Sequence, residues 1–257
     1  MLGNVAGRDY TSLDESWPAP GRIGATGGLA PLMSLETKYV APAACGHLLL
    51  QRLKAVCKPD PRFRTNHVHS VYFDTADFDA MSEVENGDYY KTKVRIRWYE
   101  SGPRSASGAF LESKCKIGRR RDKRRIALPD SFRGDLPLED PAWRRYPPLL
   151  AREGAPVPGG ELQPSLHVTY RRHRFVEPTT GLRLSLDDTI RLPRVHQRLA
   201  SVAAVVRRPA AWIVFETKGD QRQLPPTLLF IHDFGARRRA FSKYGLWRGL
   251  LRNALQR

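Results

Sequence analysis

The sequence predicts an α+β fold: an antiparallel α+β domain or an antiparallel β-barrel decorated with helices. Three observations predict it: the chain contains many strand-like segments of medium length, only a few helical ones, and no regular alternation of strand and helix. Its 257 residues suffice for one large all-β or α+β domain with its own core, or for two small domains.

The first part of the chain differs in composition from the rest. Residues 1–31 are rich in Gly, Pro, Ser and Ala, which predicts a flexible leader before a single domain at 32–257. The opening residues lack the basic patch and apolar core of a secretory signal. No segment of the sequence approaches the run of about 20 apolar residues that a membrane span needs.

The three cysteines favour a cytoplasmic location. Cys45, Cys57 and Cys115 form no CxxC spacing, and an odd number argues against a disulfide framework. We therefore expect reduced thiols in a cytoplasmic protein.

The elements follow from local periodicity. Alternating apolar and polar residues predict strands that begin at Met33, His67, Tyr90, Ala109, Asp122, Ser165, Leu182 and Ala211. Helical spacing or composition predicts helices within 42–58, after the turn at 75–81, within 143–152, and on both sides of the phrase AFSKYG at 240–245. The turns GRRR and PTTG each join two strands, and the proline-rich segment 129–164 is a long connection.

Charge is concentrated on one face of the predicted strands. The formal net charge is +17, which predicts a polyanionic partner. Because side chains alternate along a strand, the segment from Tyr90 places four cations on one face: Lys91, Lys93, Arg95 and Arg97. A half-exposed strand with a basic outer face gives the same pattern. Nearly every strand repeats it, however, and like charges on neighbouring strands repel, so we expect the cations to line a tunnel around an anion.

Three Glu-x-Lys triplets lie next to apolar residues: Glu36–Lys38, Glu112–Lys114 and Glu216–Lys218. Arg and Lys side chains would bind a chain of phosphates. A carboxylate beside them would orient a lysine or hold a divalent metal that bridges phosphates.

Eight short motifs then occur in an order that resembles the VTC-type polyphosphate polymerase domain, a branch of the CYTH-like triphosphate tunnel superfamily. They are ETKYV, SVYFDT, KVRIRWYE, FLESKCK with DKRR, VTYRR, LRLSLD, IVFETKGD and FSKYG, which together cover residues 33–247. The resemblance implies a tunnel that binds ATP and inorganic polyphosphate and transfers the terminal phosphate of ATP to the growing chain, with Mn²⁺ or Mg²⁺ as cofactor.

The resemblance also implies site residues. Those placed at the reacting phosphates are Lys38, Arg95, Arg97, Lys114, Arg172 and Lys243. Those placed at phosphate or nucleotide are Lys123, Tyr170, Arg183, Lys218 and Ser242, and Glu216 is the metal ligand.

Two departures from the family pattern bear on activity. Ser34 stands where hydrolytic members of the fold carry the first Glu of Glu-x-Glu-x-Lys, which favours the polymerase branch. Ala240 stands where polymerases can carry a basic residue, and Arg237–Arg239 are candidates to replace it.

Two other functions remain as alternatives. One is a triphosphatase or polyphosphatase of the same fold, and the other is a non-catalytic binder of polyphosphate or RNA. No nucleic-acid motif is present, so no specific nucleic acid is expected, whereas a membrane-protein partner remains open.

Several smaller features have two interpretations. His67 and His69 could form a metal pair, but ordinary strand polarity is favoured because no third ligand lies at a recognisable spacing. Asp187 is expected to share a face with Arg183, and Asp188 the opposite face. The run GRRRDKRR is either a solvated turn or a region that draws polyphosphate to the entrance.

Overall fold

The computed structural model describes residues 35–80, 90–102, 105–118, 120–198, 208–221 and 223–247. The predicted leader at 1–31, the domain boundary after it, and the strand start at Met33 lie outside these ranges. The predicted helix after the turn at 75–81 is described only as far as residue 80.

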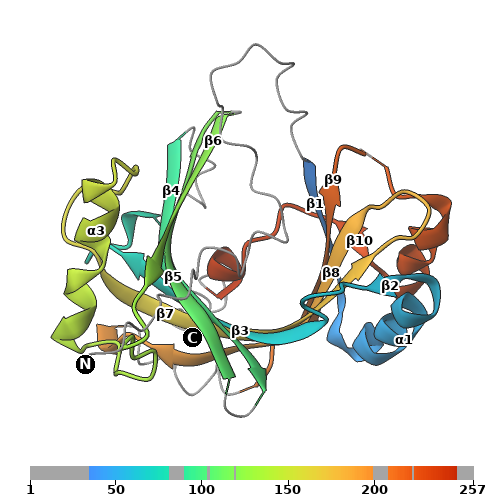
Figure 1. Cartoon of the computed structure of the whole chain (residues 1–257), viewed down its shortest axis with the longest axis horizontal. Helices are drawn as coiled ribbons and strands as arrows, with labels where there is room; N and C mark the ends of the chain where they lie inside the picture. Colours follow the sequence, from blue (N-terminus) through green and yellow to red (C-terminus); the bar gives the residue numbers. More distant parts are fainter. Residues whose placement is uncertain are drawn as a thin grey trace, which may run out of the picture.

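Ten antiparallel strands form one sheet in the order β10-β1-β9-β8-β7-β3-β4-β5-β6, and β2 pairs with β7. The strands are β1 (Leu35–Pro42), β2 (Lys58–Pro59), β3 (Thr65–Asp74), β4 (Tyr90–Gly102), β5 (Ser105–Ile117), β6 (Arg120–Leu128), β7 (Gln163–Val176), β8 (Arg183–Val195), β9 (Trp212–Gly219) and β10 (Arg237–Arg238). Figure 1 shows the sheet curling so that β4, β5 and β6 face β1, β9 and β8 across a concave space. Among the described strands, β10 and β6 do not pair with each other, so hydrogen bonds do not close the sheet. The predicted antiparallel tunnel fold is confirmed.

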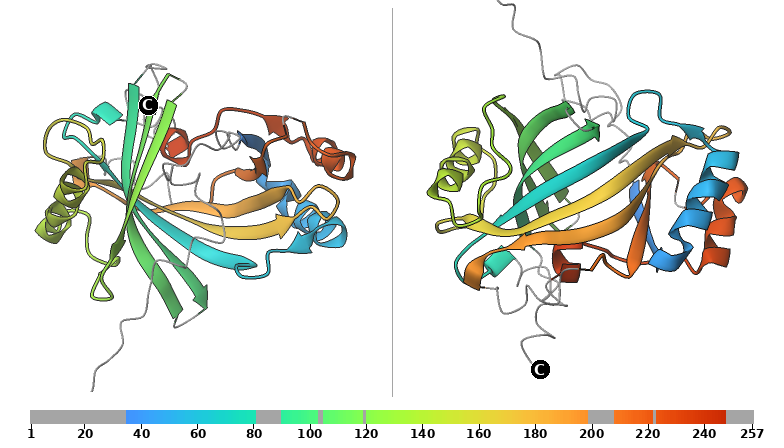
Figure 2. Two further views of the ribbon diagram at one scale, coloured as in Figure 1. Left: turned by 45° about the horizontal axis from the view of Figure 1, so that its top comes forward. Right: turned by 90° about the horizontal axis from the view of Figure 1, so that it is seen from below.

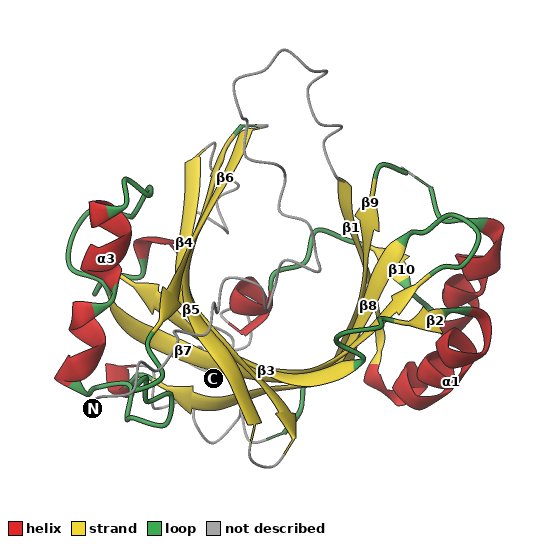
Figure 3. Ribbon diagram, in the orientation of Figure 1, coloured by secondary structure: helices red, strands yellow, loops and turns green. Residues whose placement is uncertain are grey.

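Helices cover the convex side of this sheet in two groups (Figure 3). One group contains η2 (Ala43–Cys45), α1 (Gly46–Val56) and η5 (Pro226–Phe234), and the other contains η3 (Pro141–Arg145) and α3 (Pro147–Arg152). Figure 2 shows the long strands β3, β7 and β8 running from one group to the other. No helix in the described part of the chain combines the length and apolar character that a membrane span requires.

The apolar strand faces pack against these helices. Leu184 and Phe215 are buried with Leu49 and Leu53 of α1. On the other side, Ile96 and Leu111 belong to a cluster that includes Trp143 and Leu150. Burial of each such side chain contributes roughly 1.5–3 kcal/mol. This packing fixes the opposite, charged face of each strand toward the concave space.

The concave face is not cationic along its whole length, contrary to the expectation from alternation. One part is apolar, and it includes Val68, Leu166 and Val214. Tyr244 and Trp247, from a short helix at 243–247, pack against it. The unlabelled helical turn in the middle of the concave space in Figure 1 is this segment. It confines the charged surface to the remainder of the channel.

The C-terminal part also contains a strand that was not predicted. Gly235 ends η5 in the left-handed conformation (φ 72°), which favours glycine. The chain then pairs with β1, with Tyr39 opposite Arg238. Two residues are too few to show alternation, so β10 has no periodic signal in the sequence.

Candidate functional site

The register of β4, β5 and β6 arranges the inward-facing residues in rows across the sheet. The first row is Arg95, Glu112 and Arg125, and the second is Lys93, Lys114 and Lys123. The third row, nearest the start of β4, is Lys91, Lys116 and Arg121. A carboxylate therefore interrupts the first row, whereas the next two contain cations alone.

Glu112 is the centre of the first row and is 2% exposed. Its carboxylate accepts a hydrogen bond from Arg95 Nε at 2.7 Å and lies 2.6 Å from Arg95 Nη2. Lys123 and Arg125 approach it at 3.4 and 3.5 Å. Burial alone would raise the pKa of Glu112, but Arg95, Arg97, Lys123 and Arg125 hold that pKa well below its ordinary value. The side chain is therefore a buried anion.

Asp187 is the second buried anion and is inaccessible to solvent. Arg172 donates to it twice, at 2.6 and 2.8 Å, and Lys243 donates at 2.5 Å. Burial opposes ionisation of Asp187, but Arg172 and Lys243 lower its pKa to about 2. Asp187 shares its face of β8 with Arg183, as expected, and its ion pair with Arg172 follows from the register of β7 and β8, which sets the two residues opposite each other.

Tyr170 lies beneath the same cations. It is 2% exposed, and its ring centroid is 5.3 Å from the Arg172 guanidinium carbon and 4.3 Å from Lys243 Nζ. At these distances the ring attracts both cations through its π-face. Tyr170 thus supports the cations from below.

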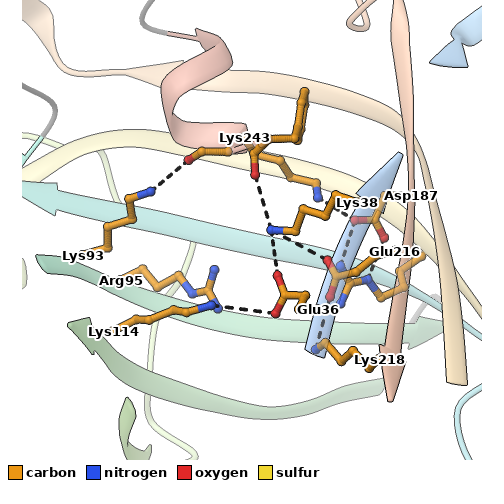
Figure 4. A network of polar contacts seen from close by, with 12 residues as sticks. Glu36, Lys38, Lys93, Arg95, Lys114, Asp187, Glu216, Lys218 and Lys243 are labelled. Carbon is orange, nitrogen blue, oxygen red and sulfur yellow. Dashed lines mark hydrogen bonds and ion pairs between the residues drawn. The ribbon is translucent and has the colours of Figure 1, made fainter. Parts of the chain in front are cut away.

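Two Glu-x-Lys triplets face each other on β1 and β9. Antiparallel pairing sets Glu36 opposite Lys218 and Lys38 opposite Glu216, so each carboxylate lies across from an ammonium. Lys38 Nζ is 2.8 Å from Glu36 and 4.0 Å from Glu216, and Lys218 is 3.2 Å from Glu216. Figure 4 shows Lys38 between the two carboxylates.

The third triplet behaves differently. Its lysine, Lys114, reaches across the channel to Glu36 at 3.8 Å, whereas its carboxylate belongs to the first row. Glu216, in contrast, stays near its own triplet and is buried. Burial raises the pKa of Glu216, but Lys218, Lys38, Arg172 and Lys243 outweigh this and hold the pKa well below its ordinary value.

The phrase Phe241-Ser242-Lys243 reaches the same network from the C-terminal segment. The Phe241 carbonyl accepts from Lys38 Nζ at 3.3 Å, and Ser242 Oγ accepts from Lys93 Nζ at 3.1 Å. Together with the Lys243–Asp187 contact, these bonds join β1, β4 and β8 through one short segment (Figure 4).

A cavity of about 620 Å³ opens beside this network. Eight cations and one carboxylate line it, together with Thr37, Ala240 and Phe241; the charged residues are Lys38, Lys91, Lys93, Lys114, Lys116, Arg121, Arg238, Arg239 and Glu36. Burial, together with Lys38, Lys114 and Arg95, lowers the pKa of Lys93 to about 8. So large an excess of positive charge in one cavity favours a ligand with several negative charges.

The predicted site residues all lie on the concave side of the sheet, but they have different contacts. Lys38 and Lys114 line the cavity. The register sets the side chains of Arg97 and Arg183 on the same concave face, and Arg97 Nε donates to Ser70 Oγ at 3.3 Å. Of the others, Arg95 and Lys123 contact Glu112, Arg172 and Lys243 contact Asp187, and Lys218 contacts Glu216. Ser242 contacts Lys93, and Tyr170 lies beneath Arg172 and Lys243.

Six cavity cations were absent from the predicted site: Lys91, Lys93, Lys116, Arg121, Arg238 and Arg239. Alternation in the sequence already placed Lys91 and Lys93 on the charged face, so that signal was available. The sequence offers Arg238 and Arg239 only as replacements for the missing basic residue at Ala240, and all three residues line the cavity.

His69 lies on the convex side, away from this cavity. Its ring stacks on Trp98 with centroids 4.9 Å apart, and its Nδ1 is 3.2 Å from His167 Nε2. Within the described ranges, no three His, Cys, Asp or Glu side chains are grouped so that they could hold a metal ion. The contacts of His69 are those of a packed polar residue.

Glu36 and Glu216 are two carboxylates of the channel that could ligate a divalent metal. Both approach Lys38. Burial and the charge of Glu216 oppose ionisation of Glu36, but Lys38, Lys114 and Lys218 lower its pKa. Mg²⁺ and Mn²⁺ prefer carboxylate oxygen ligands, and Mg²⁺ is commonly held by one or two carboxylates together with the phosphates of a substrate. Two carboxylates beside a cationic cavity therefore fit such an ion when an anionic ligand supplies the other donors.

The fold and the site define a class: a domain of antiparallel strands that curl around a cation-lined channel. The sequence matches the model of the VTC domain over residues 34–248, and the chain belongs to this family.

Solved structures with a similar arrangement have low sequence identity. The PH1819 protein of Pyrococcus horikoshii is 14% identical, with a TM-score of 0.46, over 86% of this chain and 98% of that one. HpAC1 of Hippeastrum, an adenylyl cyclase candidate with a dominant triphosphatase activity, is 18% identical, with a TM-score of 0.43, over 84% and 96%. Among the curated proteins, no sequence matches this chain.

Proposed function

We propose that this protein is a metal-dependent polyphosphate polymerase that transfers the γ-phosphate of ATP to inorganic polyphosphate inside the channel. The observation that carries the proposal is the cavity itself, in which eight cations face one carboxylate. A linear polyanion matches this charge, and membership of the VTC-domain family supports the same ligand class.

The reaction needs alignment and charge neutralisation more than a covalent nucleophile. A terminal oxygen of the polyphosphate forms a bond to the γ-phosphorus, the bond from that phosphorus to the β,γ-bridging oxygen breaks, and ADP leaves with the electron pair. We assign contacts with the reacting phosphates to Lys38, Arg95, Arg97, Lys114, Arg172 and Lys243. Contacts with the rest of the nucleotide or polymer are assigned to Lys123, Arg183, Lys218 and Ser242, with Tyr170 beneath them.

Glu216, with Glu36 beside it, would hold Mn²⁺ or Mg²⁺ against the phosphates. When bound, the metal would neutralise charge on the phosphate oxygens. The protein's own part is to keep Glu216 ionised, which Lys218 and Lys38 favour. Glu216→Gln is therefore expected to abolish metal-dependent turnover in a folded protein, and full activity of this variant would remove the metal assignment.

One assay separates the proposed polymerase from its alternatives. Purified protein is incubated with ATP and Mn²⁺, long polyphosphate is stained on a gel, and ADP and free phosphate are quantified. ADP together with polymer supports synthesis. Free phosphate without polymer would instead identify a hydrolase, and the absence of both products would identify a binding protein. We also propose a cytoplasmic location, where ATP is available.

A further inference from the structure

The C-terminal segment 241–247 contributes three contacts to the charged network, yet it is attached to the sheet through different residues, which pack on the apolar part of the concave face. Ser242 and Lys243 point toward Lys93 and Asp187. The next residue, Tyr244, turns away from the network and into the apolar part of the concave face, where it is 1% exposed. The conformation of the segment therefore depends on how Tyr244 is held.

Tyr244 is held by a buried carboxylate far away in the sequence. Its hydroxyl donates a hydrogen bond to Asp74 Oδ2, and Asp74, at the end of β3, is fully buried. The other oxygen, Asp74 Oδ1, accepts from the backbone N–H groups of Thr75 and Ala80, each at 2.9 Å. Since these backbone bonds fix the carboxylate, the Tyr244 hydroxyl meets a rigid acceptor.

A second contact joins Tyr244 to the charged rows. Its ring stacks on Tyr72 with centroids 4.8 Å apart, and the Tyr72 hydroxyl lies 3.5 Å from Arg95 Nη1. Ser165 Oγ, 3.3 Å from the Tyr244 hydroxyl, completes its surroundings. Tyr244 thus stacks on a β3 residue that contacts Arg95, and it directly follows Lys243 in the chain.

We propose that Tyr244 and Asp74 are positioning residues for the phosphate site. Their hydrogen bond holds the segment 241–247 so that Ser242, Lys243 and the Phe241 carbonyl stay within reach of Lys93, Asp187 and Lys38. Neither residue touches the ligand. This positioning role of Tyr244 and Asp74 rests on the proposed function in one respect: the ligand is a phosphate chain.

Tyr244→Phe tests this role, because it removes the hydroxyl and keeps the stacked ring. Tyr146→Phe is the matched control. Tyr146 is also buried, at 3% exposed, and its hydroxyl accepts from Arg145 at 2.8 Å between η3 and α3, outside the channel. Both proteins are compared with the unmodified chain for calorimetric affinity for inorganic tripolyphosphate, for kcat and KM with ATP and Mn²⁺, and for amide hydrogen exchange of residues 241–247.

The expected result is a tenfold or greater loss of tripolyphosphate affinity in Tyr244→Phe, with faster exchange confined to 241–247 and less than a twofold change in the control. A loss that lies in kcat while KM for ATP is unchanged, with tripolyphosphate affinity kept, would also indicate misplacement of Lys243 at the reacting phosphate. Unchanged affinity, kcat and exchange in Tyr244→Phe would overturn the proposal, as would an equal loss in the control.

Failure of the proposed function gives a different result. If the unmodified protein binds no tripolyphosphate and releases no ADP, the polymerase proposal fails, and hydrogen exchange alone decides the anchoring role. In that case faster hydrogen exchange at 241–247 in Tyr244→Phe supports the proposal that the Tyr244–Asp74 hydrogen bond holds this segment, and unchanged exchange overturns it.

Discussion

Positive charge is paired differently in two regions of the channel: the interior, around Glu112 and Asp187, and the mouth, which is the third row nearest the start of β4. In the interior, Arg95 and Arg172 each meet a buried carboxylate, Glu112 or Asp187, at hydrogen-bonding distance. At the mouth, Lys91, Lys116 and Arg121 form a row without a carboxylate. These interior arginines are therefore neutralised by the protein itself, whereas the mouth leaves its charge to be neutralised by a ligand.

This difference indicates two roles for cations that, in the sequence alone, all belong to one charged strand face. Carboxylates that bond to arginines hold those side chains in fixed positions, which suits alignment of a reacting group. Cations at the mouth, which face solvent and each other, suit attraction of a flexible polyanion. Four substitutions or titrations can break or sharpen the comparison.

The largest effect is expected in the interior, from Glu112→Gln. This change removes the negative charge shared by Arg95, Lys123 and Arg125, and loss of one partner from a buried ion pair costs about 3–5 kcal/mol. Urea unfolding should show the loss. The control is Glu161→Gln, in an exposed pair with Arg144, where we expect less than about 1 kcal/mol. Equal stability of the two variants would show that the interior does not need its carboxylate.

Acid should weaken the interior next. The pKa of Asp187 is about 2 in the folded protein, below its ordinary 3.8, so ionised Asp187 stabilises the fold above the higher value. This contribution, about 2 kcal/mol at most, is lost as the pH falls from about 4 toward 2. Unfolding free energies measured across this range should therefore fall less steeply in Asp187→Asn. Parallel curves for the variant and the unmodified protein would contradict the assignment.

Lys93 lies between the two regions, and we expect its positive charge to lower the free energy of unfolding. Its pKa falls from the ordinary 10.5 to about 8, so the folded protein binds this proton less tightly than the unfolded chain. Stability is thus lost as the pH drops from about 10.5 to 8. Lys93→Met should be more stable than the unmodified protein at pH 7, by about 1–2 kcal/mol, but not at pH 10.5.

The same substitution should weaken binding, since it removes a cation from the cavity. Tripolyphosphate affinity measured at pH 7 should fall while the denaturation midpoint rises. A variant that is both less stable and unchanged in affinity would reverse this interpretation of Lys93.

The smallest effect on stability is expected at the mouth. The double variant Lys116→Ala with Arg121→Ala should change the unfolding free energy by no more than about 0.5 kcal/mol, because both side chains are exposed. Its affinity for long polyphosphate should nevertheless fall and become less sensitive to salt, with little change for tripolyphosphate. Lys54→Ala, on α1, is the control. Equal losses for both polymer lengths would show that the mouth and the interior bind the same phosphates.

Much of this arrangement could be predicted from the sequence, because alternation in a strand decides which side chains share a face. The charged face of β4, for example, follows from Lys91, Lys93, Arg95 and Arg97. Alternation does not decide register. Asp187 meets Arg172 only because β7 and β8 pair with irregularities near Thr169, and no local pattern encodes these shifts.

The apolar part of the channel could not be predicted for a related reason. Val68 and Leu166 alternate with their neighbours in the same way as residues of the convex core. They are covered instead by Tyr244 and Trp247, which come from the far end of the chain. Only tertiary contact distinguishes the two faces there.

The two outer strands of the sheet have a consequence for self-association. A strand with a free edge can accept a strand from another molecule and so begin aggregation. Here the described outer strands are rich in arginine and lysine: β10 consists of Arg237 and Arg238, and β6 includes Lys123 and Arg124. Repulsion between such edges opposes sheet-to-sheet growth, so the charges at the margins of this sheet also protect its solubility.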